Sequence, residues 1–357
     1  GEEWPMSKTM KALVYNGPGK YALEDVPVPE IRKPTDVIAR VTLAAICTSD
    51  IHQVRGEIEG IPFPRIQGHE FCAEVVEAGS AVKNLKPGDR CMVMPGTFCG
   101  ECDMCRRGQF LLCSDGGVFG SMSLDGCHAE YIRVPAADRT MFPLPAGLTD
   151  EDVIMLPDML ATAWFGIVNG GFTEGGTIAV VGVGPVGQCA CLLAKKAFAA
   201  SQVIAFDTLQ YRLEMAKEAG NADHIINPAE EKALSKLKEY TNGAGVDVVV
   251  ETAGIKATFD LAVSSARYGG TVSTVAVPAA PFAVNMPEVV FRNLTIKAGI
   301  QNSAGIRKMM KMIMEGKIST RFLLTHRAPL NDIEKGYEVF GHQQDNCMKW
   351  LITPYER

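Results

Sequence analysis

The chain of 357 residues is long enough to bury a full hydrophobic core, and its length suggests two medium domains or one large one. Its 35 basic and 41 acidic residues give a formal charge of -6, which argues against nucleic acid as a main partner. Apolar residues make up 47% and charged residues 21%, proportions that are ordinary for a globular protein.

The first residues, GEEWPMSKTMKALVY, do not have the form of a secretory signal, because acids, a proline and lysines stand where a basic start and an apolar run would be needed. We therefore expect a cytoplasmic protein. Gly1 to Pro5, ahead of Met6, are expected to be left over from cleavage of a tag. Residues 175–194 carry no charge, but the motif VGVGPVG within them predicts a buried strand, a tight turn and a helix instead of a membrane span.

Two metal-binding residue types stand early in the chain, Cys47 in AICTSDIH and His69 in RIQGHEF. A catalytic zinc site needs three protein ligands, drawn from Cys, His and carboxylate, and an open fourth position. Cys47 and His69 could supply two of these ligands. Taken singly, each has a plainer interpretation, because a lone Cys is commonly a small core residue and a lone His a surface group.

Four cysteines follow in FCGECDMCRRGQFLLC with the spacing C-x2-C-x2-C-x7-C, at Cys99, Cys102, Cys105 and Cys113. Two-residue gaps let successive thiolates turn onto one ion, and four thiolates complete a tetrahedral zinc shell with no open position. The motif therefore predicts a structural zinc site. Chance clustering and an iron–sulfur cluster, which favours other spacings, are the alternatives.

A glycine-rich motif, Gly182-Val183-Gly184-Pro185-Val186-Gly187, lies between the strand-like TIAVV and the helix-forming QCACLLAKKA. In this context it predicts a dinucleotide site in which the pyrophosphate lies at a helix N-terminus. A second strand, QVIAFD, ends at Asp207, which can accept hydrogen bonds from the adenosine ribose and would repel a 2′-phosphate, so NAD(H) is favoured over NADP(H). An ordinary glycine turn of an α/β domain is the alternative.

Later segments extend this domain. VDVVVETAG and GGTVSTVAV are typical of buried strands that end at small residues, so the sheet is expected to be doubly wound. The methionine-rich KKMMKMIMEGK predicts an amphipathic helix that packs its apolar face. The remaining cysteines are expected to be reduced core residues, namely Cys72, Cys91, Cys127, Cys189, Cys191 and Cys347.

Together these motifs resemble the zinc-dependent medium-chain dehydrogenase/reductase family over nearly the whole chain, from about Met10 to the C-terminus. The resemblance implies an α/β protein with a GroES-like, mostly β catalytic domain at residues 1–158, which carries the structural zinc lobe at about 95–115. A Rossmann domain with a doubly wound parallel sheet would follow at 159–300, and residues 301–357 would return to the catalytic domain. AICTSDIH, GHE and LPDMLATAWFG are most similar to the tetrameric bacterial secondary alcohol dehydrogenases.

The resemblance supplies a third ligand for the catalytic zinc. Asp158 in MLPDMLATAWFG stands where the primary alcohol dehydrogenases have a cysteine, so Cys47, His69 and Asp158 are the implied ligands. A carboxylate in place of a thiolate makes the site harder and its zinc more exchangeable. With the structural site, this implies two zinc ions per chain.

Two acidic residues have implied roles beside these ligands. Glu70 resembles the family glutamate that approaches the metal when water or substrate exchanges. Asp50 resembles the carboxylate that orients the ligand imidazole, and it could also cap a helix that starts after Thr48-Ser49.

The implied reaction is hydride transfer between a secondary alcohol and nicotinamide, with zinc as the Lewis acid. By the resemblance, Ser49 contacts the substrate and takes its proton, which passes through the ribose hydroxyls to His52. His52 suits this step because the unperturbed pKa of imidazole is about 6.5. A solvent-exposed helix histidine is the alternative.

Further cofactor contacts are implied more weakly. Thr162 would lie near the nicotinamide, the backbone of Val275-Ala276-Val277 would hold the carboxamide, and Lys349 would reach the pyrophosphate. Each has a plainer interpretation. Thr162 could be an ordinary hydroxyl on a helix, Val275-Ala276-Val277 a strand of the core, and Lys349 a solvated lysine.

The substrate is left open by the sequence. Gly116 to Gly126, GGVFGSMSLDG, are expected to line part of the pocket, with Val118 or Phe119 facing the substrate. This segment and Phe206-Asp207-Thr208 depart from the pattern of the NADP(H)-dependent secondary alcohol dehydrogenases, which admits a bulkier alcohol such as a hydroxysteroid. Among the zinc enzymes of the family, polyol, sugar and threonine dehydrogenases are closer alternatives, because they share the GHE motif and the cysteine lobe.

Two more distant alternatives remain within the same superfamily. A zinc-lacking quinone reductase would have no need of the zinc ligands proposed above. A non-enzymatic family member would be expected to lose the zinc ligands or the proton-relay residues. The implied assembly is a homotetramer, with a homodimer as the alternative, and neither a membrane nor nucleic acid is an expected partner.

Overall fold

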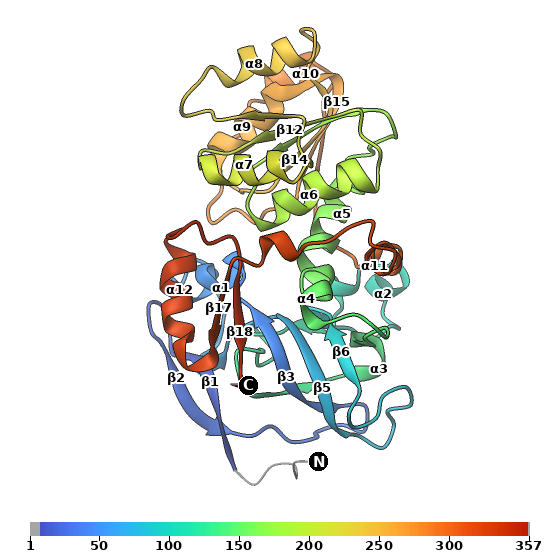
Figure 1. Cartoon of the computed structure of the whole chain (residues 1–357), viewed down its shortest axis with the longest axis vertical. Coiled ribbons are helices and arrows are strands. Elements are labelled where there is room, and N and C mark those ends of the chain that lie inside the picture. The colour runs from blue at the N-terminus through green and yellow to red at the C-terminus, as the bar shows by residue number, and fades with distance from the viewer. Residues whose placement is uncertain (1–7, 356–357) are drawn as a thin grey trace. The chain divides into compact units, whose positions relative to one another are not determined.

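The protein is described by a computed structural model that covers residues 8–355 (Figure 1). The expected tag remnant, Gly1 to Pro5, lies outside the described residues. The chain divides into two compact units. Unit 1 comprises Gly1–Asp158 and Ser319–Arg357, and unit 2 comprises Met159–Ile318.

The strands of unit 1 are β1 (Thr9–Tyr15), β2 (Tyr21–Pro27), β3 (Val37–Ala45), β4 (Arg65–Ile66), β5 (Glu70–Ala78), β6 (Arg90–Val93), β7 (Gly96–Thr97), β8 (Gly117–Val118), β9 (Tyr131–Val134), β10 (Met141–Pro143), β17 (His326–Pro329) and β18 (Trp350–Thr353). The largest sheet has the order β10-β6-β5-β3-β18-β17, and β9 also pairs with β3. The C-terminal strand β18 lies antiparallel beside β3, with Leu351 opposite Ala45, so the returning chain completes this sheet (Figure 1).

The helices of unit 1 are short, except for α1 and α12. They are α1 (Thr48–Val54), α2 (Asp103–Arg106), η1 (Phe110–Leu112), α3 (Ala137–Thr140), α4 (Asp150–Val153), η3 (Arg321–Leu323), η4 (Leu330–Asp332) and α12 (Ile333–Gly341), and a π-helical turn, η2 (Leu156–Leu160), spans the boundary between the units. The core of unit 1 draws side chains from the large sheet, from β1, α1 and α12 and from several loops, and it contains Phe71, Tyr337 and Trp350.

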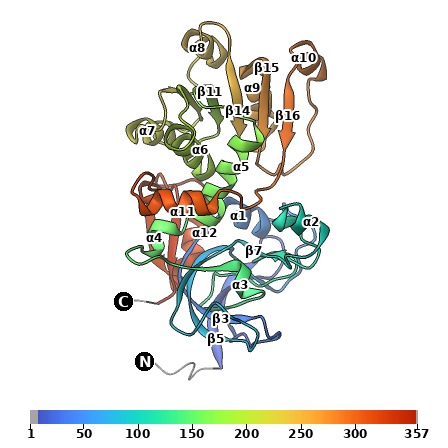
Figure 2. The ribbon, with the colours of Figure 1, turned by 90° about the vertical axis from the view of Figure 1, so that its right-hand side faces the viewer.

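The strands of unit 2 are β11 (Thr177–Val181), β12 (Gln202–Phe206), β13 (His224–Ile226), β14 (Val246–Glu251), β15 (Ala266–Thr274) and β16 (Thr295–Ala298). They form one parallel sheet in the order β13-β12-β11-β14-β15-β16. In chain order this is 3-2-1-4-5-6, the order of dinucleotide-binding sheets. The runs TIAVV and VDVVVE are rich in buried valine because helices cover both faces of the sheet (Figure 2). The expected doubly wound sheet is confirmed.

The helices of unit 2 are α5 (Ala161–Asn169), α6 (Pro185–Lys196), α7 (Gln210–Glu218), α8 (Ala233–Tyr240), α9 (Lys256–Ser265), α10 (Met286–Phe291) and α11 (Ile306–Met314). The methionine-rich helix α11 buries Met309 and Met312, as expected of an amphipathic helix. A Cβ on Gly305 would lie 2.5 Å from the ring of Trp164 on α5, and Lys308 lies 5.1 Å from the centre of that ring. These contacts keep α11 with unit 2, so the return to unit 1 begins at Ser319 and not at residue 301.

The uncharged segment, for most of its length, and the remaining cysteines lie in the interior of the fold. The uncharged residues 175–194 divide into β11 and most of α6, and no helix in the described part of the chain is long and apolar enough to cross a membrane. The cysteines outside the two metal motifs are all buried, and none forms a disulfide, namely Cys72, Cys91, Cys127, Cys189, Cys191 and Cys347.

Candidate metal centre and nucleotide-binding loop

Four potential metal ligands converge in unit 1. Cys47, His69, Glu70 and Asp158 each offer one ligand atom, and these atoms lie within 4.8 Å of one another. The first three residues are buried, and Asp158 is half-buried. The structure therefore groups the three ligands implied for the catalytic zinc, together with the glutamate that follows His69.

Strand pairing brings two of these residues together. Ala45, the last residue of β3, pairs with Glu70, the first residue of β5. Cys47 follows this pair by two residues and His69 precedes it by one. The antiparallel register therefore brings the backbones of these two ligands close together.

Asp50 connects the metal ligands to helix α1. Its Oδ2 accepts a hydrogen bond of 2.9 Å from the backbone N–H of Cys47, the N-cap residue of α1. Its Oδ1 lies 3.1 Å from Nδ1 of His69. One carboxylate thus makes both interactions considered for it, the helix cap and the contact with the imidazole. Although burial opposes it, the charge of His69 lowers the pKa of this enclosed carboxyl.

The imidazole of His69 presents Nε2 to the other ligands. This nitrogen lies 3.3 Å from Oδ2 of Asp158 and 3.4 Å from Oγ of Ser49, while Nδ1 is occupied by Asp50. Burial alone would lower the pKa of His69, but the surrounding anionic groups, Asp50 first, raise it well above its usual value. One imidazole nitrogen, a thiol and carboxylates around one point are a donor set that zinc accepts, and their excess of negative charge suits a cation.

Asp158 lies in the π-helical turn η2, between α4 and α5. Single π turns are rare and occur frequently at functional sites, because the wider turn changes the direction in which the following side chains point. Here the turn includes Pro157 and carries the Asp158 carboxylate to His69.

Glu70 forms an ion pair with Lys349, the residue that the resemblance places at the pyrophosphate of the cofactor. Nζ of Lys349 lies 2.7 Å from both carboxylate oxygens of Glu70, and both side chains are fully enclosed. Burial raises the pKa of Glu70 to about 7; although burial would lower that of Lys349, the carboxylate raises it. The implied contact of Lys349 with the pyrophosphate is thus not what this structure shows, because its ammonium group is held by Glu70.

The two proposed relay residues lie on α1. Ser49 donates a hydrogen bond of 3.3 Å to Sγ of Cys47, so its hydroxyl is at the metal ligands. His52, one turn further along, forms a hydrogen bond through Nδ1 with the carboxylate of Glu57, and its side chain is 36% exposed. The structure therefore places Ser49 at the site and His52 within reach of water.

The four-cysteine motif forms a second group, whose sulfur atoms lie within 4.8 Å of one another. Cys102 and Cys113 are 3.8 Å apart, and Cys99 and Cys105 are 4.0 Å apart. Sulfurs bound to one zinc at about 2.3 Å in a tetrahedron would be about 3.8 Å apart, so the group fits this ion. Backbone N–H groups, that of Cys105 first, lower the pKa of Cys102 to about 6, which favours the thiolate that a metal needs.

The glycine motif forms the expected turn between β11 and α6. Gly182 has a φ of +88°, which glycine adopts without strain, and Gly184 is the N-cap of the helix. Pro185 occupies the first helical position and Val186 follows it. A Cβ on Gly187 would lie 2.0 Å from the carbonyl oxygen of Gly182, so only glycine fits there. The free N–H groups at the start of α6 are suited to a phosphate.

Asp207 follows β12, where the sequence predicts a ribose-binding carboxylate. Its two oxygens accept hydrogen bonds of 2.9 Å from the backbone N–H groups of Val183 and Leu209. Nη1 of Arg212 lies 3.7 Å from its Oδ2. No sequence motif singled out Arg212, whose signal is a basic residue five positions after Asp207, and its positive charge lies beside this carboxylate.

Glu251, at the end of β14, is a second residue that sequence analysis missed. Its enclosed carboxylate accepts hydrogen bonds from the backbone N–H groups of Ala253 and Gly254, at 2.9 and 2.8 Å, and from the hydroxyls of Thr258 and Thr274, at 2.8 and 2.7 Å. It thereby joins the loop after β14 to the end of β15. The available signal was a charged residue at the end of the strand-like run VDVVVE.

The weaker cofactor residues lie in unit 2. Thr162 is the second residue of α5. Val275 directly follows β15 and donates a backbone hydrogen bond of 3.1 Å to Glu251, while Val277 is 71% exposed. A Cβ on Gly254 would lie 3.2 Å from the carbonyl oxygen of Val277, so this backbone approaches the loop after β14 closely.

One of the two expected substrate-facing residues belongs to the core. Phe119 is fully buried, and its ring meets that of Phe71 edge to face at 5.4 Å. Because successive side chains of an extended chain point to opposite sides, Val118, which is half-buried on β8, does not share this position. Phe119 is therefore not a substrate contact, and Val118 stays a prediction.

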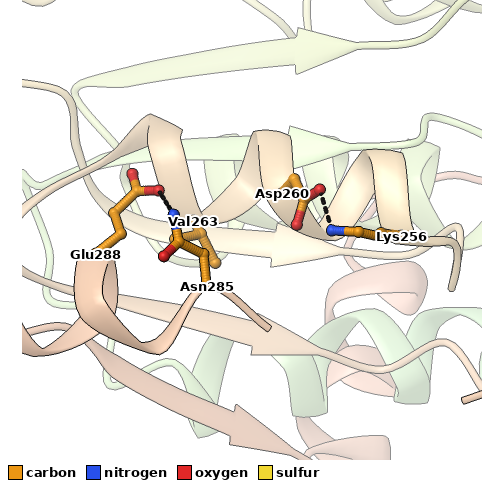
Figure 3. A pocket seen from close by; sticks show the side chains of 5 residues that line it. All are labelled: Lys256, Asp260, Val263, Asn285 and Glu288. Atoms are coloured by element: carbon orange, nitrogen blue, oxygen red, sulfur yellow. Dashed lines mark hydrogen bonds and ion pairs between the residues drawn. The ribbon is translucent and has the colours of Figure 1, made fainter. Parts of the chain in front are cut away.

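A polar pocket of about 280 Å³ lies in unit 2 between α9 and the start of α10 (Figure 3). Lys256 pairs with Asp260 at 2.6 Å, and Asn285 donates a hydrogen bond of 3.3 Å to Glu288. None of the predicted site residues lines this pocket, and its charged groups already have partners.

A parallel sheet of this order with a glycine turn is typical of dinucleotide-binding domains, and the same chain also groups metal ligands. Residues 33–146 match the family described as "Alcohol dehydrogenase GroES-like domain", and residues 185–315 match "Zinc-binding dehydrogenase". The expected combination of a GroES-like and a Rossmann domain is thus confirmed.

Individual proteins show the same likeness. An alcohol dehydrogenase of Cupriavidus necator is 32% identical over 98% of this chain and 100% of its own length. An L-threonine 3-dehydrogenase of Bacillus licheniformis is 34% identical, with the same coverage of 98% and 100%. The apo structure of zinc-dependent alcohol dehydrogenase 2 from Streptococcus pneumonia is 35% identical, has a TM-score of 0.92, and the match covers 98% of this chain and 99% of that one. The chain belongs to the zinc-dependent medium-chain dehydrogenase/reductase family and is an oxidoreductase.

Proposed function

We propose that this protein is a zinc- and NAD(H)-dependent dehydrogenase that interconverts a secondary alcohol and a ketone. The observation that carries the proposal is the convergence of Cys47, His69 and Asp158, with ligand atoms within 4.8 Å of one another. A carboxylate here takes the place of the second thiolate in the Cys2His set of alcohol dehydrogenase, as in the secondary alcohol branch that the motifs resemble. When bound, zinc supplies Lewis-acid polarisation of the substrate oxygen, and the nicotinamide carries the hydride.

The chain itself must move a proton between the substrate and water. Ser49 is suited to receive it because its hydroxyl is 3.3 Å from the sulfur of Cys47 and 3.4 Å from Nε2 of His69. His52 is suited to release it because its side chain is 36% exposed and its Nδ1 is hydrogen-bonded to the carboxylate of Glu57. Asp50 holds the imidazole of His69 in one orientation.

The second zinc ion is assigned to Cys99, Cys102, Cys105 and Cys113. All four positions of a tetrahedral shell would be taken by sulfur, so the ion stabilises the lobe and takes no part in the reaction. We thus propose two zinc ions per chain.

NAD(H) is the proposed cofactor because Asp207 presents a carboxylate at the end of β12. Each of its oxygens accepts one backbone hydrogen bond and retains a lone pair for a ribose hydroxyl. Arg212, 3.7 Å away, is the specific observation in favour of NADP(H) as the second candidate. In the nucleotide site, the N–H groups at the start of α6 would hold the pyrophosphate.

The first experiment measures the initial rate of NAD+ reduction by zinc-loaded protein with 2-butanol and with 1-butanol, and repeats the better alcohol with NADP+. A rate with 2-butanol and NAD+ alone is the expected result. Preference for NADP+ would remove Asp207 from its role. Activity confined to L-threonine, the substrate named for the Bacillus licheniformis relative, or to a polyol, sugar or hydroxysteroid, would replace the small secondary alcohol.

We propose a homotetramer in the cytoplasm, with a homodimer as the alternative. Its support is the apolar surface of unit 2, where Phe291 on α10 is 84% exposed and Val290 63% exposed, next to the edge strand β16. Sedimentation equilibrium of the holoenzyme gives the assembly directly, and a monomer would contradict the proposal.

A further inference from the structure

His128 is a fully buried histidine outside every motif discussed above. Its backbone N–H donates a hydrogen bond of 2.9 Å to the carbonyl of Gln67, and the N–H of Cys127 donates one of 3.0 Å to that of Gly68. The segment around His128 therefore runs beside the residues that lead into His69.

The imidazole of His128 occupies the space that a side chain at position 68 would need. A Cβ built on Gly68 would lie 2.4 Å from Cδ2 of His128 and 2.6 Å from its Nε2. Gly68 also has a φ of +96°, which side chains rarely tolerate. The glycine of the GHE motif is thus required twice, by its backbone conformation and by the ring packed against it.

Two hydrogen bonds determine the orientation of this ring. Nε2 lies 3.2 Å from the carbonyl oxygen of Ala45, and Nδ1 lies 2.8 Å from the hydroxyl of Tyr337 on α12. A carbonyl only accepts, so Nε2 carries the proton, and Nδ1 accepts from the hydroxyl of Tyr337. Burial lowers the pKa of His128 and raises that of Tyr337, so both groups are neutral, as this arrangement requires.

We infer that His128, oriented by Tyr337, is a positioning residue that sets the separation of Cys47 and His69 in the metal site. The ring contacts the carbonyl of Ala45, two residues before Cys47, and packs on Gly68, the residue before His69. Loss of these contacts would let the two backbones move apart, and a metal site tolerates displacements of only about 0.5 Å. The inference rests on the proposed zinc site.

The test compares His128→Phe, which keeps a flat ring without hydrogen bonds, with Tyr337→Phe, which removes one hydroxyl. The rate of zinc release to a chromophoric chelator and the visible spectrum of the cobalt-substituted protein are measured. His128→Phe is expected to accelerate release of one of the two zinc ions about 10- to 100-fold and to shift the cobalt bands. Tyr337→Phe should accelerate the same phase about three- to tenfold, and His128→Gln, which keeps a donor, should restore part of the wild-type rate.

Tyr355→Phe is the matched control, because it also removes one tyrosine hydroxyl of the same unit, but the 2.9 Å hydrogen bond of this hydroxyl goes to the backbone carbonyl of Glu130 and not to the imidazole of His128. It should leave both release phases unchanged. Wild-type release and cobalt spectra in folded His128→Phe would overturn the inference, and if that variant does not fold, the same result in Tyr337→Phe would do so. Failure of the proposed function is distinguishable, because wild-type protein itself would then hold zinc in the cysteine lobe only.

Discussion

The ammonium group of Lys349 lies 2.7 Å from the carboxylate of Glu70, with both side chains fully enclosed and 279 residues apart in the chain. Glu70 is one of the four grouped metal ligands, so this ion pair ties the C-terminal segment to the candidate metal site. A buried charge is tolerated only while its counter-charges remain, and Lys349 is the first of those that oppose the effect of burial on the Glu70 carboxyl.

Replacing Lys349 by Met should lower the free energy of unfolding by about 3–5 kcal/mol, because it leaves the Glu70 carboxylate buried without its counter-charge. Urea unfolding at a fixed zinc concentration measures this. The double variant with Glu70→Gln should regain most of the loss, since it buries no charge. Equal stabilities of wild type and Lys349→Met would show that the pair does not contribute.

Asp50→Asn should weaken zinc binding about 10- to 100-fold, because an amide no longer favours the imidazole orientation that the carboxylate fixes. Competition with a chelator of known affinity measures the change. The control is Asp36→Asn, which alters another fully buried carboxylate of unit 1 that binds Arg133 at 2.9 Å. The control should lower stability and leave zinc affinity unchanged, and equal zinc affinities of the two variants would contradict the role of Asp50.

Asp207→Ser should reduce kcat/KM for NAD+ about 10- to 100-fold, the effect of losing hydrogen bonds to a charged acceptor. The rate with NADP+ should rise, because Arg212 remains to bind a 2′-phosphate. Steady-state kinetics with both cofactors measure the ratio. Adding Arg212→Gln should abolish the gain with NADP+, and an unchanged ratio in Asp207→Ser would show that another residue selects the cofactor.

Glu251→Gln should raise KM for the cofactor while kcat changes little, because the loop after β14 and the end of β15 lose their shared acceptor. The new amide NH2 group would face hydroxyls and backbone N–H groups that are themselves donors. The free energy of unfolding should therefore also fall by about 1–3 kcal/mol. Thr274→Val removes only the 2.7 Å bond to this carboxylate and should show a smaller change of the same kind. Wild-type KM in Glu251→Gln would contradict this role.

Acid should remove the stability that Asp152 contributes. Its hydrogen bond with Arg321, first among the causes, lowers the pKa of Asp152 to about 2 from an ordinary 3.8. A depressed folded pKa stabilises the protein above the unfolded pKa, and the contribution is lost as pH falls from about 5 towards 2. With its side chain 20% exposed, we expect about 1 kcal/mol after screening. The free energies of unfolding of wild type and Asp152→Asn should therefore differ at pH 7 and converge as the pH falls towards 2, and a constant difference would contradict the assignment.

Features carried by neighbouring residues could be predicted from the sequence. The spacing of Cys99, Cys102 and Cys105, the glycines of the turn after β11 and the apolar runs of the parallel strands all depend on contacts within a short stretch of chain. Strand, turn and helix propensities act over the same short range, so the Rossmann sheet and the cysteine lobe were predictable.

Contacts between segments far apart in the chain could be found only in the tertiary structure. The pairing of Lys349 with Glu70, the ring of His128 against Gly68 and the burial of Phe119 against Phe71 leave no local pattern. Each depends on which strands become neighbours and in which register, and a side chain acquires its partner only once that register exists. The motifs therefore predicted the parallel sheet, the glycine turn and the cysteine lobe, whereas folding decided which buried groups hold the candidate ligands in place.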